Sequence, residues 1–432
     1  MIIAVFIISM LVGIGIGLPI AVALLFCAVC TAMAMGGGNA NPTIIARTLM
    51  QGSDSVTMMA LPFFVLAGEI MNKGGLTKRI IKFCDIFLGR VRGGLGYVTI
   101  FACLRFAALV GSAVAACAAL GAILIPMMVK SGYNREHSSA LVASANLVAP
   151  IMPPSVPMIV YGVSAGVSIK SMFMAGIAPA VYLTIIACVV WFFDTRKKGI
   201  VPDTEDFVAP TFKEAMQIIF GGMWALLLPV IIMVGLHSGR FTATEAGVIA
   251  CVYAIIVGLF VYRELKFKDL GPVFVSAAKT SSVVMFLAAA ANCAAYYMTV
   301  SRIPQLMTAG LGGLVGRPHL LMFVLMLIVV VVGLAMDVTP SILILTPIML
   351  PLVKAAGISP IYFGLCFVLM NVLGLTSPPV GPVLNVACAA GNVKMDKIIP
   401  PTMPYFIAQT LLCFLLALVP PLVEVPLAWF GG

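Results

Sequence analysis

The stretch Ala149-Pro150-Ile151-Met152-Pro153-Pro154-Ser155-Val156-Pro157 decides the fold, because four prolines within eight residues cannot lie inside one continuous helix. The stretch Thr376-Ser377-Pro378-Pro379-Val380-Gly381-Pro382 repeats its Pro-Pro-x-x-Pro spacing. Apolar arms of roughly 12–15 residues flank both stretches, and arms of this length are too short to cross a bilayer. We therefore predict two re-entrant hairpins with the proline stretches at their tips.

The two proline stretches lie on one ungapped diagonal that joins the halves of the chain. Pro126 falls on Pro351 (351 − 126 = 225), and Pro153 falls on Pro378 at the same offset. Because glycine and proline fix backbone shape, their coincidence indicates a repeated structure. The further matches are Gly132 on Gly357, Pro154 on Pro379, Pro157 on Pro382, Gly166 on Gly391 and Pro179 on Pro404. The sequence thus predicts a first repeat at 1–200, a polar connecting loop at 201–215 and a second repeat at 216–432.

The composition is that of a membrane protein. Of the 432 residues, 62% are hydrophobic and 9% are charged, whereas soluble domains carry about 25% charged residues. Uncharged runs such as 1–35 are long enough to cross a bilayer, and we interpret this first run as a retained helix, not a signal peptide. We expect an all-α membrane protein with about 10–12 transmembrane helices. The net charge of +10 sits in short loops, which argues against nucleic-acid binding.

The charged loops predict how the two repeats are oriented. The loop 72–92 is strongly basic, whereas its counterpart 297–317 carries only Arg302 and Arg317. The bias reverses one loop earlier, where 36–46 is uncharged and its counterpart carries Arg263, Lys266 and Lys268. Equivalent loops with opposite charge bias should lie on opposite sides of the membrane. This pattern predicts an inverted-topology repeat, as in many secondary transporters.

Each half contains a second predicted break. Gly111-Ser112-Ala113-Val114 interrupts the long apolar stretch 94–129, and Ser112 aligns with Asp337 at the offset of 225 (337 − 112). Pro340 follows Asp337 and cannot continue a hydrogen-bond ladder. We predict broken helices at these two places. Irregular backbone at membrane depth lines a wet cavity or is buried, and it offers carbonyls to cations and helix N-termini to anions.

Several motifs together resemble one transporter family, the large permease subunit of TRAP (tripartite, binding-protein-dependent) transporters. They are Leu61-Pro62-Phe63-Phe64-Val65-Leu66-Ala67-Gly68-Glu69, Gly93-Gly94-Leu95-Gly96, Thr242-Ala243-Thr244-Glu245-Ala246-Gly247, Met336-Asp337-Val338-Thr339-Pro340 and the two proline stretches. The resemblance runs from about 5 to 425. Trp224-Ala225-Leu226-Leu227-Leu228-Pro229 and Ile361-Tyr362-Phe363-Gly364 are most similar to the branch that carries sugar acids such as diketogulonate.

The resemblance implies an elevator-type carrier with scaffold and transport parts. It implies sodium-driven uptake of an organic acid, either a dicarboxylate or a sugar acid, by a multi-pass protein of the bacterial inner membrane. The implied partners are a small DctQ-like membrane subunit and a periplasmic DctP-like substrate-binding protein, with sodium as coupling ion and no other cofactor. An enzyme is not expected, because the sequence has no HExxH, no Gly-x-Ser-x-Gly and no close His–Asp pair. The alternative is an ion channel of inverted-repeat architecture.

The resemblance also implies site residues. One sodium ion would lie by Ser112 and the backbone of Ala149, Met152 and Pro154. The other would lie by Asp337 and the backbone of Gly333, Gly374 and Thr376. The substrate would lie between them, near Ser155, Thr339, Ser377, Pro378 and Pro379.

Asp337 has an independent physical case for binding sodium. A carboxylate at mid-membrane costs roughly 2.5–3.5 kcal/mol on insertion scales, and such groups have partners. No Lys or Arg lies within a helical turn of Asp337 in the sequence. A bound cation would balance this charge, and the alternative is a capping or packing role.

Other polar residues leave alternatives open. The family pattern Ser-Gly-Ser-Ala-Val-Ala-Asp has Val110 and Ala116 here, so we hypothesise that the first ion site is weakened and that Arg105 replaces part of its charge. The alternative is that Arg105 reaches a lipid headgroup or a neighbouring subunit. Asp54 and Glu69 flank Pro62, and each is either a gating residue or a helix-end charge.

Overall fold

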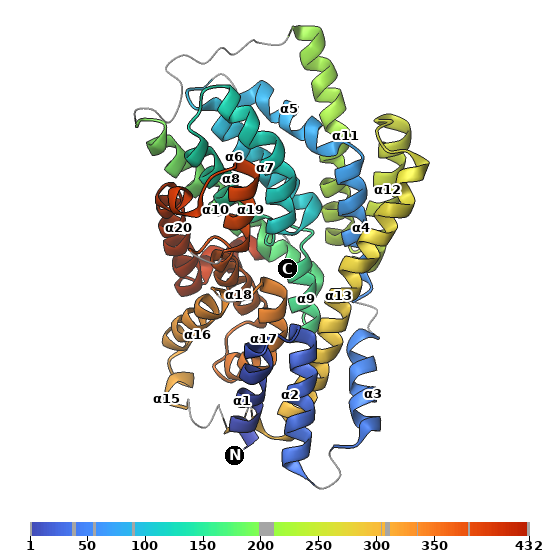
Figure 1. Ribbon diagram of the computed structural model, residues 1–432, viewed down its shortest axis with the longest axis vertical. Helices are drawn as coiled ribbons and strands as arrows, with labels where there is room; N and C mark the ends of the chain where they lie inside the picture. The colour runs from blue at the N-terminus through green and yellow to red at the C-terminus, as the bar shows by residue number, and fades with distance from the viewer. Residues whose placement is uncertain are drawn as a thin grey trace.

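The computed structural model describes residues 2–36, 40–54, 58–88, 91–197, 211–303, 305–306, 312–334, 336–378 and 381–429 (Figure 1). Helices and turns make up these residues, and no strand occurs among them. Within this part of the chain, seven helices are long and apolar enough to cross a membrane, and seven further apolar helices have 10–17 residues. The prediction of an all-α membrane protein is confirmed.

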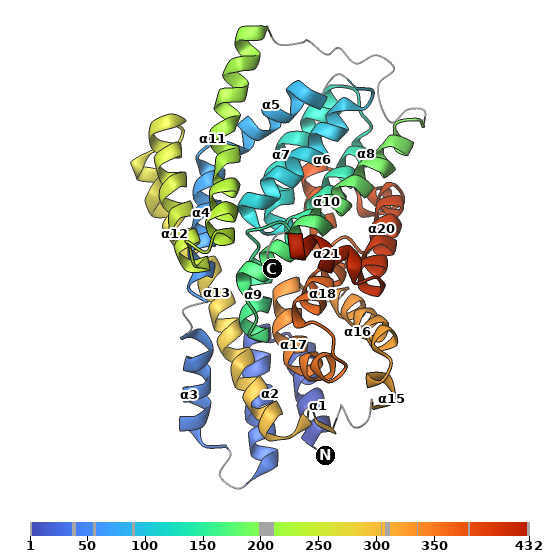
Figure 2. The same ribbon diagram turned by 180° about the vertical axis from the view of Figure 1, so that it is seen from behind.

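One set of helices, which we call the frame group, packs mainly against itself. Its helices α3, α4, α11, α12 and α13 lie along one side of the molecule in both views, with α5 at one end and α1 and α2 at the other (Figures 1 and 2). Its central element is α13, a 34-residue helix against which α2, α3 and α4 pack. The members are α1 (Ile2–Gly15), α2 (Ile20–Met35), α3 (Pro42–Ser53), α4 (Ala60–Lys73), α5 (Leu76–Leu88), α11 (Phe212–His237), α12 (Ala243–Ile256) with the π-turn η2 (Val257–Val261), and α13 (Phe267–Val300).

The remaining helices form a second set, the core group, beside the frame group. Its members are α6 (Gly94–Val110), α7 (Ala113–Lys130), α8 (Arg135–Ala145), the 3-10 turn η1 (Asn146–Val148), α9 (Val156–Ala165), α10 (Ile169–Asp194), α15 (Gly312–Val315), α16 (Pro318–Gly333), α17 (Val338–Ala355), α18 (Pro360–Gly374), α19 (Pro382–Gly391), α20 (Met395–Leu418) and α21 (Pro421–Trp429). The two sets meet through α5, α6 and α11 and through the contacts of α4 and α13 with α6, α9 and α17.

Helix boundaries in the core group keep the offset found in the sequence. α7 spans 113–130 and α17 spans 338–355, so both ends differ by 225. α8 begins at 135 and α18 at 360, with the same difference. The pair α6–α7 lies at one end of the molecule and the pair α16–α17 at the other (Figure 1). Equivalent elements are therefore inverted.

The re-entrant hairpins are α6–α7 and α16–α17, and the arms of each pair pack together. In the first pair, Thr99 Oγ1 lies 3.4 Å from Met128 Sδ. Trp191 joins the outer ends, because its Nε1 donates to Gly93 O at 2.9 Å and its ring stacks on Tyr133. The chain reverses at Gly111, whose φ of 65° is a conformation that glycine adopts without strain. The sequence prediction had a broken helix at this place and is wrong on this point.

The proline stretches lie in discontinuous helices that continue in one direction, not in hairpins. α9 packs against α17 and α18, and α19 packs against α7 and α8, whereas neither α8–α9 nor α18–α19 forms a substantial pair. Arg135 at the start of α8 donates to Gly391 O at 2.9 Å, and Tyr161 of α9 donates to Pro360 O at 2.7 Å. The far end of each discontinuous helix thus meets the start of the other. Proline interrupts the hydrogen-bond ladder but does not by itself reverse the chain.

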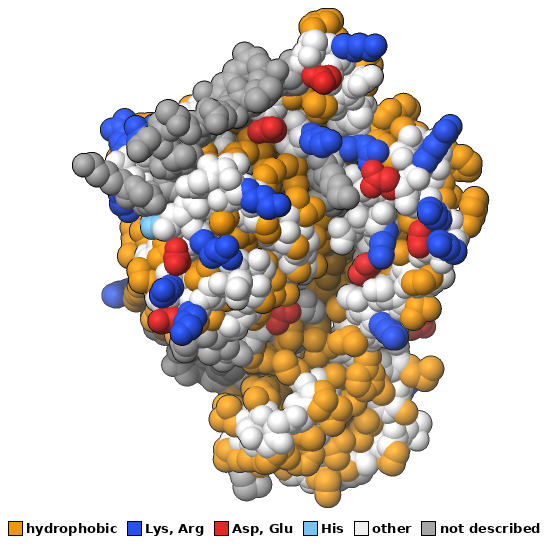
Figure 3. Space-filling model, turned by 45° about the horizontal axis from the view of Figure 1, so that its top comes forward, with side chains coloured by type: hydrophobic (Ala, Val, Ile, Leu, Met, Phe, Trp, Pro, Cys, Tyr) orange, Lys and Arg blue, Asp and Glu red, His pale blue; other side chains and the backbone are white. Residues whose placement is uncertain are grey.

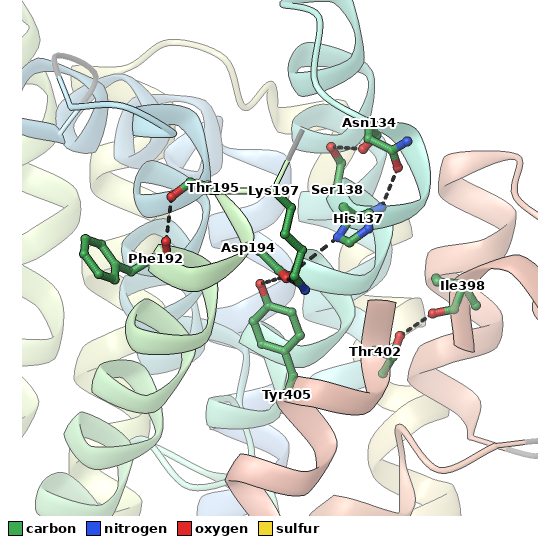
Figure 4. A network of polar contacts seen from close by, with 10 residues as sticks. All are labelled: Asn134, His137, Ser138, Phe192, Asp194, Thr195, Lys197, Ile398, Thr402 and Tyr405. Atoms are coloured by element: carbon green, nitrogen blue, oxygen red, sulfur yellow. Dashed lines mark hydrogen bonds and ion pairs between the residues drawn. The ribbon is translucent and has the colours of Figure 1, made fainter. Parts of the chain in front are cut away.

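An ion-pair cluster around a buried carboxylate joins α8, α10 and α20 of the core group (Figure 4). The carboxylate of Asp194, at the end of α10, is 2% exposed. It accepts from Lys197 Nζ at 2.7 Å and from Tyr405 OH of α20 at 3.3 Å. His137 Nδ1 of α8 lies 3.6 Å from the same carboxylate. The cluster fixes the outer end of α8, and so contributes to positioning the break that follows it.

The surface divides into a charged end and an apolar end. Lys and Arg side chains gather around the end that carries α5, whereas the face of the opposite lobe drawn in Figure 3 shows hydrophobic and other uncharged groups. Large exposed hydrophobic side chains cover α1, α11 and α13. Exposed hydrophobic surfaces of this extent are stable in lipid, whereas their exposure to water is unfavourable. This is a multi-pass membrane protein.

Candidate functional site

A cavity of about 290 Å³ lies between the frame group and the core group. Its wall takes residues from the turns of both hairpins, from both proline breaks and from two frame-group helices. The surface is hollowed between the two groups in the view of Figure 3. The wall residues are Val65, Gly68, Glu69, Asn72, Phe106, Val110, Gly111, Ser112, Ala113, Val114, Ala115, Pro150, Val156, Pro157, Thr280, Val284, Asp337, Val338, Thr339 and Leu375.

The first hairpin turn lies directly against the first proline break. A Cβ atom at Gly111 would be 3.0 Å from Pro154 O and 3.2 Å from Val156 N. Ser112 is the N-cap of α7, and its hydroxyl accepts from Ala115 N at 3.5 Å. Of the first predicted ion set, Ser112 lines the cavity and Pro154 lies beside the turn, while Ala149 is buried and Met152 is half-buried.

The second hairpin turn and the second break approach even more closely. A Cβ atom at Gly374 would be 2.0 Å from Gly333 O, so only glycine fits. Asp337 is the N-cap of α17 and accepts from Val338 N at 2.8 Å. Asp337 lines the cavity, and Thr376, in the second break, is buried. The structure thus brings Gly333 and Gly374 of the second predicted set together, with Asp337 on the cavity wall.

Of the predicted substrate residues, some reach the cavity and others do not. Thr339 lines the cavity. Ser155 and Ser377 are buried, and their hydroxyls form hydrogen bonds within their own breaks. Ser155 Oγ donates to Pro150 O, and Ser377 Oγ donates to Gly374 O at 2.7 Å. Pro378 is half-buried and does not belong to the wall, and Pro379 lies outside the described residues.

Two residues that the sequence analysis missed are a symmetric pair of buried amides. Asn146 and Asn371 are 0% exposed and differ by 225 (371 − 146). Asn146 Nδ2 donates to Val142 O at 2.7 Å, but its Oδ1 has no hydrogen-bond partner among the described residues, and neither side-chain atom of Asn371 has one. An unsatisfied buried amide costs about 1–3 kcal/mol, so it indicates a missing partner. The repeat diagonal carried the signal for this pair, because it aligns the two asparagines.

The frame group contributes a polar wall. Glu69 and Asn72 of α4 and Thr280 of α13 face the hairpin turns across the cavity. Glu69 Oε1 accepts from Ser276 Oγ at 3.3 Å. The sequence left Glu69 as a gating or helix-end residue, and the structure places it on the cavity wall. Asp54 is the exposed C-cap of α3 and is not part of the wall.

Arg105 does not reach this site. It is exposed on α6 and lies close to Cys84 of α5, whereas its neighbour Phe106 lines the cavity. The hypothesis that its guanidinium replaces charge at the first ion site has no support from this geometry. Among the wall residues there is no Lys, Arg or His. No group of three His, Cys, Asp or Glu occurs within the described part of the chain, so a cation here would be held chiefly by backbone carbonyls, amide oxygens and single side chains.

Two hairpins, two discontinuous helices and a shared cavity define a membrane transporter built from inverted repeats. The profile described as "Tripartite ATP-independent periplasmic transporter, DctM component" matches residues 7–422. The chain belongs to this DctM family, and its members are transporters, not enzymes.

Relatives agree with this assignment, and a solved structure has a similar fold. A putative TRAP transporter large permease protein of Haemophilus influenzae is 45% identical, over 90% of this chain and 91% of its own length. The 2,3-diketo-L-gulonate TRAP transporter large permease protein YiaN of Escherichia coli is 44% identical, over 90% of each chain. MtrF of Neisseria gonorrhoeae has a TM-score of 0.67 at 12% identity, over 92% of this chain and 95% of its own, and this likeness shows the fold alone.

Proposed function

We propose that this protein takes up an organic acid, a dicarboxylate or a sugar acid, together with sodium across the bacterial inner membrane. It would do so as the large membrane subunit of a binding-protein-dependent transporter. The observation that carries the proposal is the single cavity in which both hairpin turns and both proline breaks meet. A site shared by two inverted repeats can be exposed to either side of a membrane in turn.

Asp337 supports the choice of a cation as the coupling species. Its carboxylate faces a cavity whose described wall carries no basic side chain. Sodium would be held by this carboxylate together with the backbone at Gly333, Gly374 and Thr376. Asn371, whose backbone carbonyl lies against Gly333 and whose side-chain amide is buried, would be a further ligand. Two sodium ions moving inward gain about 4.6 kcal/mol per 100 mV, from about 2.3 per charge, which is sufficient to concentrate an anion.

The first repeat offers an analogous but poorer ion site. Ser112 supplies a neutral hydroxyl where the second repeat has Asp337. The backbone near Ala149, Met152 and Pro154 would supply further oxygens, and so would the Oδ1 of Asn146, which has no hydrogen-bond partner among the described residues. We therefore propose that this site holds sodium more weakly than the site at Asp337.

The substrate anion would lie between the two hairpin turns. The helices α7 and α17 both begin at the cavity. The N-terminus of a helix stabilises an anion through its free N–H groups and the helix dipole. Thr339 adds a hydroxyl at the wall. Ser155, Ser377, Pro378 and Pro379 belong to the breaks next to this position, and they would contribute when the breaks rearrange around a substrate.

The division into two groups supports an elevator movement. The core group contains every element that we assign to the site, except the polar wall of α4 and α13. We propose that the frame group stays fixed in the bilayer while the core group slides past it, carrying ion and substrate. The basic end with α5 would face the cytoplasm.

The proposed partners follow from this orientation. A periplasmic DctP-like binding protein would deliver the substrate at the apolar end, and a small DctQ-like membrane subunit would pack on the frame group, where α1, α11 and α13 expose large hydrophobic side chains. These exposed faces are also the surface that lipid contacts.

Uptake into proteoliposomes tests the proposal. The complete transporter, with its small subunit and loaded binding protein, should accumulate radiolabelled solute only when sodium is higher outside than inside. Asp337→Asn should lower this uptake at sodium concentrations that saturate the wild type. A sustained sodium current without solute would instead support the ion-channel alternative, and solute uptake that is indifferent to sodium would exclude sodium coupling.

A further inference from the structure

A second cavity, of about 410 Å³, lies between α5 and the start of α11, at the end of the molecule that carries α5 (Figure 1). We call it the α5–α11 pocket. Its wall contains Arg79, Lys82, Glu214, Gln217, Ile218 and Gly221. It shares no wall residue with the cavity between the hairpin turns, so the pocket is a separate candidate binding site.

The α5 side of the pocket carries two basic side chains. Arg79 Nη1 donates to Glu264 Oε1 at 2.6 Å, and the guanidinium lies 3.8 Å from the centre of the Tyr262 ring. These contacts fix Arg79, and because a guanidinium has five N–H donors, others remain for a ligand. Lys82 lies one helical turn further along α5, is exposed, and forms no ion pair among the described residues. The pocket therefore offers a fixed donor group beside an uncompensated positive charge.

The α11 side of the pocket carries the opposite charge. Glu214 Oε2 accepts from Thr211 N at 2.8 Å in the capping box that begins α11, and Glu214 forms no ion pair within the described part of the chain. Gln217 lies one turn further on and adds an amide oxygen. Lys82 and Glu214 thus line one pocket without forming an ion pair with each other. A ligand with a negative and a positive group can pair with both walls, whereas a ligand with one kind of charge would be repelled by one of them.

An exposed apolar stripe on α11 leads away from the pocket. The helix has 26 residues and is long and apolar enough to cross a membrane. Several of its large exposed hydrophobic side chains recur at intervals of three or four residues, so they share one face. The stripe consists of Met216, Phe220, Met223, Leu227, Val230 and Val234. Met216 and Phe220 immediately precede Gln217 and Gly221 of the pocket wall, so the stripe begins beside the pocket.

A charged pocket that continues into an apolar stripe on a membrane-spanning helix matches the two parts of a phospholipid. The headgroup of a phospholipid lies at the membrane surface, and its acyl chains lie along the helices in the hydrocarbon region. A soluble phosphate ester would fill the pocket and leave the stripe without a role. The combination of pocket and stripe therefore favours a lipid as the occupant.

We propose that the α5–α11 pocket binds a phospholipid whose headgroup carries a phosphate and a primary ammonium, as in phosphatidylethanolamine. The phosphate accepts from Lys82 and Arg79, and the ammonium donates to Glu214 and Gln217. The acyl chains lie along the stripe on α11. A choline headgroup has no N–H to donate and a glycerol headgroup has no positive charge, so both bind more weakly. Because α5 packs against α11 of the frame group and α6 of the core group, the lipid stabilises the connection between the two groups.

Native mass spectrometry of the purified large and small subunits tests the proposal, because it resolves individual bound lipids. The delipidated complex is titrated separately with dioleoyl phosphatidylethanolamine, phosphatidylcholine and phosphatidylglycerol, which have the same acyl chains. The first bound molecule of phosphatidylethanolamine should bind roughly tenfold more tightly than either of the others, the factor that one charge-assisted hydrogen bond supplies. Glycerophosphoethanolamine, the headgroup without acyl chains, should not displace it at the same concentration.

Variants then assign this preference to the pocket. Lys82→Gln should weaken the binding of all three lipids roughly tenfold, because the phosphate loses a charged donor. Glu214→Gln should remove the preference for phosphatidylethanolamine, and glutamine still completes the capping box of α11. Lys268→Gln, exposed near the start of α13 and outside the pocket wall, is the matched control and should bind lipids as the wild type does. All three variants should have the wild-type Tm without added lipid, which excludes misfolding as the cause.

Four results would overturn the proposal. Equal affinities for the three lipids, or an unchanged preference in Glu214→Gln, would show that the pocket does not recognise the ammonium. An equal loss of binding in Lys82→Gln and Lys268→Gln would reduce the effect to the general charge of this end of the molecule. Displacement by glycerophosphoethanolamine at equal concentration would assign the pocket to a soluble phosphate ester. A preference that appears in the large subunit alone and not in the complex would make the small subunit the occupant.

Discussion

Replacing Asp337 with asparagine separates the two roles that its carboxylate can have. As the N-cap of α17, Asp337 accepts from Val338 N at 2.8 Å. Asparagine caps helices about as well as aspartate, so Asp337→Asn should alter the free energy of unfolding by only a few tenths of a kcal/mol. Asp337→Ala removes the cap as well, and it should cost about 1 kcal/mol more. If Asp337 acts only as a helix cap, the asparagine variant should therefore differ little from the wild type in stability and in uptake.

A role in sodium binding predicts a large change in sodium dependence. Two unit charges about 4 Å apart attract by about 4 kcal/mol at an effective dielectric constant of 20, and the dehydration of ion and carboxylate offsets part of this. A net loss of about 2 kcal/mol corresponds to a rise of roughly 30-fold in the sodium concentration for half-maximal uptake. No described basic side chain on the cavity wall can take over the charge.

The assay is initial-rate uptake into proteoliposomes at a series of external sodium concentrations, alongside the thermal stability of the same preparations without sodium. The expected result is a large shift of the sodium dependence for Asp337→Asn with little change in Tm. An asparagine variant with wild-type sodium dependence would refute the assignment of this carboxylate to an ion site.

Other perturbations follow from the same geometry. Gly374→Ala places a Cβ atom 2.0 Å from Gly333 O, so it should destabilise the protein by about 2–3 kcal/mol and abolish uptake; Gly271→Ala, with open space around it, should be neutral or stabilising, and thermal melts compare the two. Asn371→Leu should keep or raise Tm, because it removes an unsatisfied buried amide, yet weaken sodium dependence; unchanged sodium dependence would show the amide to be no ligand. Asp194→Asn should lower Tm by several degrees, since it removes the negative charge of the Asp194 carboxylate, which both Lys197 and His137 contact. Arg105→Gln should leave the sodium dependence of uptake unchanged. A shift in this dependence would support the hypothesis that the Arg105 guanidinium contributes charge to the first ion site.

Most of the architecture was predictable because its signals are local. Proline and glycine mark backbone breaks wherever they occur, and their recurrence at an offset of 225 identified the equivalent elements. The direction of the chain after each break was not predictable in this way. Gly111 reverses it through one positive φ, whereas Pro153 and Pro154 interrupt a helix that continues onward. Only packing between helices distant in sequence, such as α9 with α17, distinguishes the two cases.

The candidate site was predictable in part. Ser112, Asp337 and Thr339 reach the cavity because they follow the breaks that the sequence marked. Ser155 and Ser377 follow breaks too, but their hydroxyls cap their own turns, a choice that depends on local geometry. Asn146 and Asn371 were missed because, apart from Ser112 and Asp337, the repeat was traced through glycine and proline. Glu69 required the tertiary structure, which brings α4 against the core group.

Simultaneous measurement of sodium and solute flux in proteoliposomes tests the central claim most directly. The complete transporter should move sodium and organic acid inward in a fixed ratio, each flux stopping when the other species is removed, and Asp337→Asn should suppress both at sodium concentrations that saturate the wild type. A sodium flux that persists without solute, or solute uptake that persists without sodium, would contradict the assignment of this cavity to a sodium-coupled carrier.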